Sequence, residues 1–231
     1  MGVPPQDRQV PTIRIEQFGQ EREPVVVIDN FSGRADDLAR IGRSASYRPQ
    51  SVYPGLRSPA DGAYLMPMYS MLSDILARAF GLSGANVEAC DYSIVSVAPD
   101  RLTSAQRIPH YDDTSPFVIA LLHFTQAAEW GGTAFFRHRR TGFETIQSER
   151  IDTYAAAICE DDREFGPPDT GYACGNSRRF EQIGAIESKP DRAILYRGRT
   201  LHSGIIPKVP DPLGVVRSGR LTINTFLVGW T

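Results

Sequence analysis

A histidine and an aspartate stand two residues apart in the stretch RIPHYDDTSP, residues 107–116. If this stretch is a β-strand, residues i and i+2 point to the same face, so His110 and Asp112 project side by side. Asp113 then faces away from His110, which makes Asp112 the better partner. An imidazole nitrogen and a carboxylate oxygen placed in this way could hold one face of a divalent metal ion.

A third ligand has to come from elsewhere in a chain that contains only four histidines. His123 lies inside the apolar run VIALLHF, where we expect a core imidazole or one that supports the ligands. His138 lies in the basic run RHRR, where we expect a solvated turn. His202, in LYRGRTLHSGII, follows an apolar strand beside small residues and is the best candidate. Two histidines and one carboxylate on one face form the facial triad of non-heme Fe(II) oxygenases, whereas a hydrogen-bonded structural histidine is the alternative for each ring.

A candidate for the binding of an organic anion follows His202. The stretch SGRLTINTFLV is typical of a strand in which Arg220 and Thr222 share a face. A metal-chelated 2-oxo acid needs a fixed cation for its distal carboxylate, and arginine can bind a carboxylate with two parallel hydrogen bonds. Thr222 could add a hydroxyl to the same carboxylate. Arg217, in the looser turn GVVRSG, competes for the role of Arg220.

Composition describes an ordinary globular protein. The 231 residues are 41% hydrophobic and 23% charged, with a net charge of −2, which gives no electrostatic reason to expect nucleic acid or an anionic membrane as a partner. The three cysteines are widely spaced and form no CxxC pair, so we expect neither a disulfide framework nor a structural zinc site. No apolar run at the start suggests a signal peptide and none approaches a membrane span, so we expect a cytoplasmic protein.

The elements that must position these residues change in character near residue 87. Before it, a short strand at residues 25–28 precedes two helices, one after Ser32 as N-cap and one between Pro67 and Gly81. YPGLRSP between the helices is read as a loop. After residue 87, short apolar runs separated by turns indicate a β sandwich or barrel, interrupted by one helix over residues 149–163 and a long loop near residues 160–180. We predict a single domain over residues 1–231, mainly β with N-terminal helices (α+β): residues 1–86 form a helical layer and lid, and residues 87–231 the β core.

The order of these motifs resembles the Fe(II)/2-oxoglutarate-dependent dioxygenases. PHYD is followed by LLHFTQAAEWGGTAFF, then DRAILYRGRTLHSG, then GRLTINTFL, and the resemblance is closest to the prolyl-hydroxylase-like and phytanoyl-hydroxylase-like groups. It implies a double-stranded β-helix, the cupin-like jelly roll, packed by helices. It also implies Fe(II) on His110, Asp112 and His202, with 2-oxoglutarate anchored by Arg220 and Thr222. The interval from His202 to Arg220 is longer than in many of these enzymes.

The resemblance implies an oxygenase that consumes 2-oxoglutarate and O2, releases succinate and CO2, and hydroxylates a C–H bond. We expect a small-molecule substrate, with an amino acid or an amino-acid-derived metabolite as the first candidate. Two other readings stay open: a cupin-like metalloenzyme that does not use 2-oxoglutarate, and a non-catalytic jelly-roll binding module in which the three ligands never meet. The sequence does not indicate an oligomeric state.

Overall fold

The computed structural model describes residues 9–50, 52–207, 209 and 215–231. The strands within these ranges are β1 (Thr12–Gln17), β2 (Pro24–Asp29), β3 (Arg48–Pro49), β4 (Gly55–Pro59), β5 (Gly84–Val95), β6 (Val118–Phe124), β7 (Gly132–His138), β8 (Phe180–Glu187), β9 (Arg192–Arg197), β10 (His202–Ile205) and β11 (Leu221–Trp230). The α-helices are α1 (Ala35–Ser44), α2 (Tyr69–Phe80), α3 (Ile151–Phe165) and α4 (Val215–Ser218). Short 3-10 helices cover η1 (Gly62–Met68), η2 (Pro99–Arg101), η3 (Ser104–Arg107), η4 (Ala128–Trp130) and η5 (Ser148–Arg150). None of these described helices combines the length and the apolar character that crossing a membrane requires.

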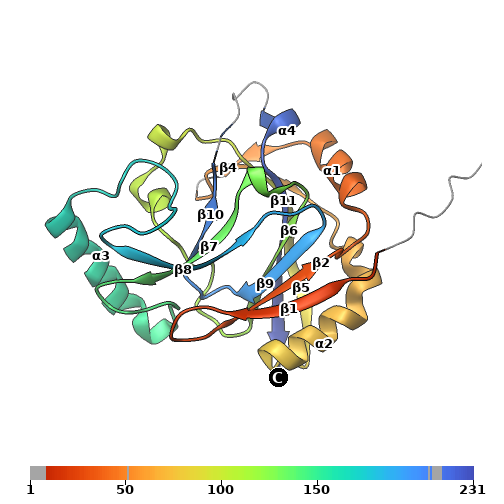
Figure 1. Ribbon diagram of the computed structural model, residues 1–231, viewed down its shortest axis with the longest axis horizontal. Coiled ribbons are helices and arrows are strands. Elements are labelled where there is room, and N and C mark those ends of the chain that lie inside the picture. Colours follow the sequence, from red (N-terminus) through yellow and green to blue (C-terminus); the bar gives the residue numbers. More distant parts are fainter. Residues whose placement is uncertain (1–8, 51, 208, 210–214) are drawn as a thin grey trace, which may run out of the picture.

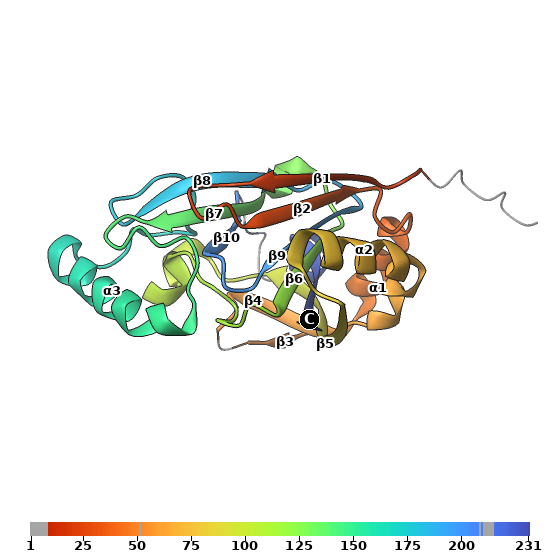
Figure 2. The ribbon, with the colours of Figure 1, turned by 90° about the horizontal axis from the view of Figure 1, so that it is seen from below.

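The strands form two sheets that face each other (Figure 1). The larger sheet has the order β1-β2-β9-β6-β11-β5-β4-β3, and the smaller has the order β10-β7-β8. The pairings between these strands are antiparallel. Figure 2 shows β7 and β8 as one layer above β4 and β5.

Strand β6 is apolar except for His123, because both of its faces are buried. Ile119 and Leu121 point outward, into a cluster that includes Leu72 of α2. Leu122 and Phe124 point inward, into a cluster that reaches Phe135 of the smaller sheet. The continuous run VIALLHF therefore marks the middle of the larger sheet rather than a buried helix.

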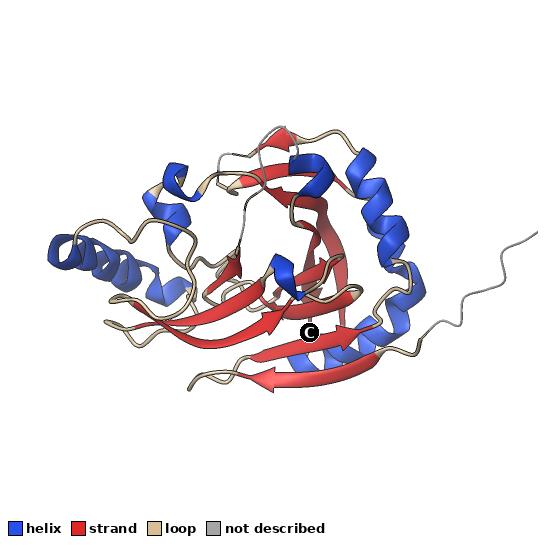
Figure 3. Ribbon diagram, turned by 45° about the horizontal axis from the view of Figure 1, so that its top comes forward, coloured by secondary structure: helices blue, strands red, loops and turns tan. Residues whose placement is uncertain are grey.

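Helices α1 and α2 cover the outer face of the larger sheet (Figure 3). The predicted end of α2 at Gly81 is confirmed: Gly81 has a φ of 69°, a left-handed conformation that glycine adopts without a Cβ clash. The predicted N-cap of α1 is wrong, because the helix begins after Arg34. Ser32 instead donates a hydrogen bond from its hydroxyl to Asp191 over 2.6 Å, which links the start of α1 to the turn before β9.

Helix α3 packs on the outer face of the smaller sheet, through Tyr154 against Phe136 and Phe180. His138, at the end of β7, belongs to this contact and is fully buried. Its Nε2 lies 2.9 Å from Asp161 of α3, and its Nδ1 lies 2.9 Å from the Thr141 hydroxyl. The prediction of a solvated turn for His138 is therefore wrong. His123 is a fully buried core imidazole, as predicted, and its Nε2 lies 3.0 Å from Asp191.

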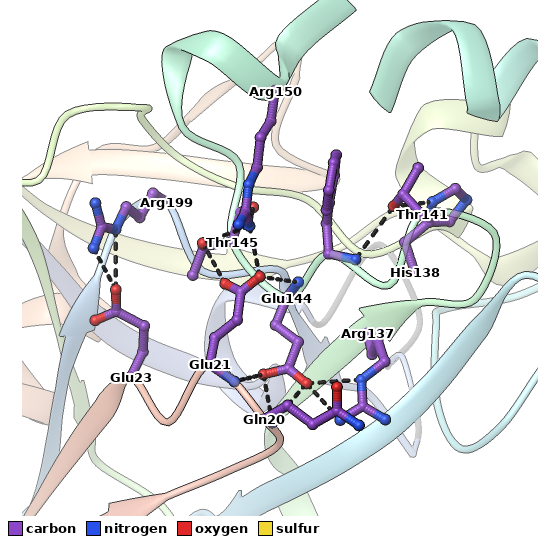
Figure 4. Close-up of polar contacts among 11 residues, drawn as sticks. Gln20, Glu21, Glu23, Arg137, His138, Thr141, Glu144, Thr145, Arg150 and Arg199 are labelled. Carbon is purple, nitrogen blue, oxygen red and sulfur yellow. Dashed lines mark hydrogen bonds and ion pairs between the residues drawn. The ribbon is translucent and has the colours of Figure 1, made fainter. Parts of the chain in front are cut away.

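A buried carboxylate fastens the turn between β1 and β2 to the smaller sheet (Figure 4). Glu144 accepts backbone hydrogen bonds from Gln20 and Glu21, each over 2.9 Å, and one from the Arg137 side chain of β7 over 2.7 Å. Glu21 in turn accepts a hydrogen bond from Arg150, next to α3, over 2.5 Å. This network holds the β1–β2 edge of the larger sheet against the smaller one.

The N-terminal part is less purely helical than the sequence analysis predicted. The stretch read as a loop, YPGLRSP, contains strand β4, which pairs with β5. Together with β1, β2 and β3 it adds strands from residues 1–86 to the larger sheet. The proline and glycine residues in this stretch have low strand propensity, so the sequence alone indicates a loop. The stretch forms a strand because it pairs with β5.

Candidate metal centre

His110 and His202 are joined through their backbones. The His110 N–H donates to the His202 carbonyl over 2.9 Å, and the His202 N–H donates back over 2.8 Å. His202 opens strand β10, whereas His110 makes only this isolated bridge and does not lie in a strand. The expectation of a strand around HxD is wrong in that detail. The bridge nevertheless brings the two rings to a centroid separation of 4.3 Å.

Asp112 is positioned by a second backbone contact, just beyond the bridge. Its N–H donates to the carbonyl of Gly198 over 2.7 Å, in the turn between β9 and β10. The same turn continues into His202, so a single short segment supports both halves of the site. Asp113 is directed elsewhere: its Oδ1 accepts a hydrogen bond from the Ser115 N–H over 2.7 Å.

The side chains of His110, Asp112 and His202 converge. One ligand atom from each lies within 4.8 Å of the other two. His110 Nε2 is 3.8 Å from Asp112 Oδ1, and His202 Nε2 is 3.6 Å from Asp112 Oδ2. Ligands held at roughly 2.0–2.2 Å from one ion stand about 3–3.5 Å apart. The three groups therefore fit a shared metal ion after small side-chain movements.

The hydrogen bond of His202 prepares its other nitrogen for a metal. His202 Nδ1 lies 2.9 Å from the carbonyl oxygen of Thr200, which can only accept, so Nδ1 carries the proton. The lone pair of the neutral ring is then on Nε2, the atom that faces Asp112. An outer hydrogen bond of this kind is the usual way that proteins orient a metal-binding histidine.

Both rings are held in the form that binds metals. Burial lowers the pKa of His202 to about 4. The pKa of His110, the more exposed ring, is lowered too, through partial desolvation and the neighbouring His202. Both imidazoles are therefore neutral near pH 7. Burial raises the pKa of Asp112, and the neighbouring His110 and the Arg57 guanidinium oppose that rise.

The site is closed at its base and open on one side. The side chain of His202 is 6% exposed, that of Asp112 is 18% exposed and that of His110 is 54% exposed. The Tyr196 ring packs against His202 with a centroid separation of 4.8 Å, which walls the buried side. A small molecule can thus approach the three ligand atoms from the side of His110.

Arg220 and Thr222 lie at the start of β11, and both are buried. The Arg220 Nη2 donates to the carbonyl of Gly132 over 2.9 Å, and the guanidinium lies over the Phe124 ring at 5.6 Å. The Thr222 hydroxyl donates to Asn224 over 3.0 Å. Arg217 falls in α4, but its side chain lies outside the described part of the structure.

Polar atoms near Arg220 remain unpaired. Its Nε is buried and has no hydrogen-bond partner among the described residues, and the same holds for the Thr133 hydroxyl. Thr133 pairs across the ladder with Gly204, and the Arg220 guanidinium lies beside Gly204. Unpaired polar atoms inside a protein cost free energy unless a water or a ligand satisfies them. A carboxylate acceptor would satisfy both.

The sequence analysis missed Arg57 of β4. Leu56 packs into the outer cluster beneath α1, so Arg57 points to the inner face of the larger sheet. It shares this face with Tyr196 of β9, whose ring packs against His202. Only the alternation along β4 could have revealed it, and that strand was read as a loop.

Comparison with known proteins agrees with this architecture. The sequence matches the family of unknown function DUF6445 over residues 9–227, and the chain belongs to that family. No curated protein sequence matches it.

Solved structures share the fold. The non-heme alpha-ketoglutarate-dependent epimerase SnoN from nogalamycin biosynthesis superposes with a TM-score of 0.53 at 10% identity, covering 90% of this chain and 80% of SnoN. SnoN in complex with Fe3+, alpha-ketoglutarate and nogalamycin RO gives a TM-score of 0.52 at 11% identity, with the same coverage. The predicted double-stranded β-helix fold is confirmed.

Proposed function

We propose that this protein is an Fe(II)- and 2-oxoglutarate-dependent oxygenase that hydroxylates a C–H bond of a small molecule. The observation that carries the proposal is the convergence of His110, Asp112 and His202, from segments far apart in the sequence, with the free nitrogen of His202 directed at the other ligands. Two histidines and one carboxylate leave ligand positions open on the ion for a co-substrate.

In this proposal the three side chains hold Fe(II). Thr200 fixes the tautomer of His202, and the Tyr196 wall keeps water from the buried side of the ligands. When bound, Fe(II) with 2-oxoglutarate and O2 supplies the oxidising chemistry, in which decarboxylation to succinate and CO2 accompanies hydroxylation of the substrate.

Arg220 is the proposed anchor for the distal carboxylate of 2-oxoglutarate. Its unpaired Nε and the unpaired Thr133 hydroxyl support this role, because an anion between them would complete their hydrogen bonds. Phe124 and Gly132 hold the guanidinium in place. Thr222 joins the anchor if its hydroxyl turns from Asn224 to the carboxylate.

The proposal is tested by an absorption band that forms only when Fe(II) and 2-oxoglutarate are present together without oxygen. We expect this band in the wild-type protein and its loss in Asp112→Ala and His202→Ala. If the wild type binds Fe(II) but shows no band with 2-oxoglutarate, the protein is a metalloenzyme of another kind. If it binds no Fe(II), the metal site itself is refuted.

A further inference from the structure

A row of polar side chains crosses the inner face of the larger sheet beside the metal-binding group. Arg57 of β4 is registered opposite Ser93 of β5, and Ser93 is registered opposite Thr222 of β11. These three residues, which we call the inner row, occupy adjacent strands at one level of the sheet. At the same level β6 contributes Phe124, so the polar character ends at β11.

Two members of the inner row have polar atoms without partners. The Nε of Arg57 and the hydroxyl of Ser93 are buried and make no hydrogen bond to any residue in the described ranges. Asp91 forms an ion pair with the Arg57 guanidinium at 4.0 Å, which is too long for a hydrogen bond. A guanidinium and a hydroxyl side by side, both unsatisfied, form an incomplete site for an oxyanion.

The strand pairing concentrates positive charge here. Arg57 is directly opposite Arg48 of β3, so two arginines face each other across the ladder at the edge of the sheet. Like charges in this arrangement destabilise a strand pair. The Tyr53 ring covers one face of the Arg57 guanidinium, whose central carbon lies 4.7 Å from the ring centroid. A bound anion would relieve the repulsion.

Arg57 shares the inner face of the larger sheet with the metal-binding group. The ring of His202 packs against Tyr196 of β9, which belongs to the inner cluster between the sheets, and Arg57 points to the same face because its neighbour Leu56 packs outward. The side chain of Arg57 is 25% exposed, so a molecule arriving from solvent can reach it.

We infer that the substrate of this protein is a small carboxylic acid, and that Arg57 with Ser93 binds its carboxylate and thereby presents the rest of the molecule to the metal. The inference rests on the proposed function and deepens it by naming the substrate class. The guanidinium of Arg57 is separate from that of Arg220, the proposed anchor for 2-oxoglutarate. Arg220 directly precedes β11 and donates to Gly132 of the smaller sheet, whereas Arg57 lies on β4, with β5 between β4 and β11.

The test uses the full-length protein loaded with Fe(II) and 2-oxoglutarate without oxygen. The probes are the L-amino acids, the matching monocarboxylic acids without the amine, and the carboxamide of each. Binding is measured by calorimetry, and succinate formation is measured after oxygen is admitted. We expect carboxylates but not their carboxamides to bind, and Arg57→Gln to weaken that binding roughly 10- to 100-fold, as for the loss of hydrogen bonds to a charged group.

Two matched variants separate recognition from structural effects. Asp91→Asn removes the Arg57–Asp91 ion pair but keeps the cation, so we expect it to retain carboxylate binding. Arg78→Gln makes the same chemical change as Arg57→Gln on the exposed side of α2 and should leave binding unchanged. Equal weakening in Asp91→Asn and Arg57→Gln would show that Arg57 acts through the ion pair, and would overturn the inference.

Three further results would also overturn the inference about the substrate carboxylate. The first is that carboxamides bind with the same affinity as carboxylates, and the second is that no carboxylate binds the loaded wild type. The third is that Arg57→Gln changes the affinity for 2-oxoglutarate as much as the affinity for the probe. In each of these cases the Fe(II)/2-oxoglutarate band still forms, so the proposed function stands. If the band is absent from the wild type, the proposed function has failed instead.

Discussion

The Nδ1 atom of His202 donates a hydrogen bond to the carbonyl oxygen of Thr200, only two residues earlier in the chain. The turn that places this carbonyl also accepts the backbone N–H of Asp112 at Gly198. One short connection between β9 and β10 therefore sets the tautomer of one proposed ligand and the position of another. This explains how two weak sequence signals, HxD and a distant histidine, can describe one local structure.

Loss of a proposed ligand should abolish tight metal binding. We expect His202→Ala and Asp112→Ala to weaken Fe(II) binding by more than the roughly 10- to 100-fold that follows loss of an outer hydrogen bond. The matched control is Asp113→Asn, because Asp113 is adjacent in the chain but its side chain accepts a hydrogen bond from the Ser115 N–H and is absent from the metal-binding group. Anaerobic Fe(II) titration measures the effect. Equal losses in Asp112→Ala and Asp113→Asn would remove Asp112 from the site.

Substitutions of Arg220 and Arg217 should differ in their effect on the 2-oxoglutarate requirement. We expect Arg220→Ala to raise the 2-oxoglutarate concentration needed for half-maximal succinate formation roughly 10- to 100-fold, because a charged partner of the carboxylate is lost. Arg220→Lys should recover part of this, since a lysine keeps the charge but not the planar donor pair. Arg217→Ala should have little effect. The reverse ranking would move the anchor to Arg217.

Stability at low pH should depend on Asp29 of β2. Hydrogen bonds from Arg192 hold the pKa of Asp29 at about 2, with Lys189 acting in the same direction and burial opposing them. The unfolded chain has a carboxyl pKa near 3.9. Since the folded pKa is the lower one, the ionised group stabilises the fold above about pH 4, and this contribution is lost as the pH falls toward 2.

The corresponding measurement compares Asp29→Asn with the wild type in urea unfolding. We expect the variant to be less stable by about 1–2 kcal/mol at pH 6. The difference between the two proteins should shrink steadily from about pH 4 downward. Asp74→Asn removes an exposed carboxyl from α2 and serves as the control for the change in net charge. A difference that stays constant down to pH 2.5 would show that Asp29 is not held by these ion pairs.

The sequence predicted the secondary structure best for elements that are buried on both faces and for helix ends that are set by a nearby capping residue. The runs in β6, β7, β9 and β11 are apolar because helices lie outside and the second sheet lies inside, and α2 ends at Gly81 as its capping residue indicates. The three candidate ligands were found because histidines are rare in this chain. Their meeting point could only be expected by resemblance.

The sequence failed where a long-range partner decides the structure. Strand β4 reads as a loop until β5 is beside it, and Arg57 went unrecognised for that reason. Ser32 has the side chain of an N-cap, but its hydroxyl bonds to Asp191, more than half the chain away. His138 stands among arginines in the sequence, yet α3 folds back over it and supplies Asp161. No local pattern contains that information.

The burial of His138 leads to the last prediction. Its ring is fully buried, and its Nε2 lies 2.9 Å from Asp161, whose carboxylate is also held by Arg140 at 2.6 Å. His138→Ala leaves a cavity and removes one partner of a buried carboxylate, so we expect a loss of about 2–4 kcal/mol in the free energy of unfolding. Arg139→Ala, at the exposed neighbouring position, should reduce the free energy of unfolding much less.

The His138→Ala variant should leave the metal centre intact. Because His138 lies on the α3 side of the smaller sheet and is absent from the metal-binding group, Fe(II) affinity should be unchanged in the folded His138→Ala protein. A variant as stable as the wild type would show that the contact between β7 and α3 does not depend on this imidazole, and weakened Fe(II) binding would connect it to the metal centre after all.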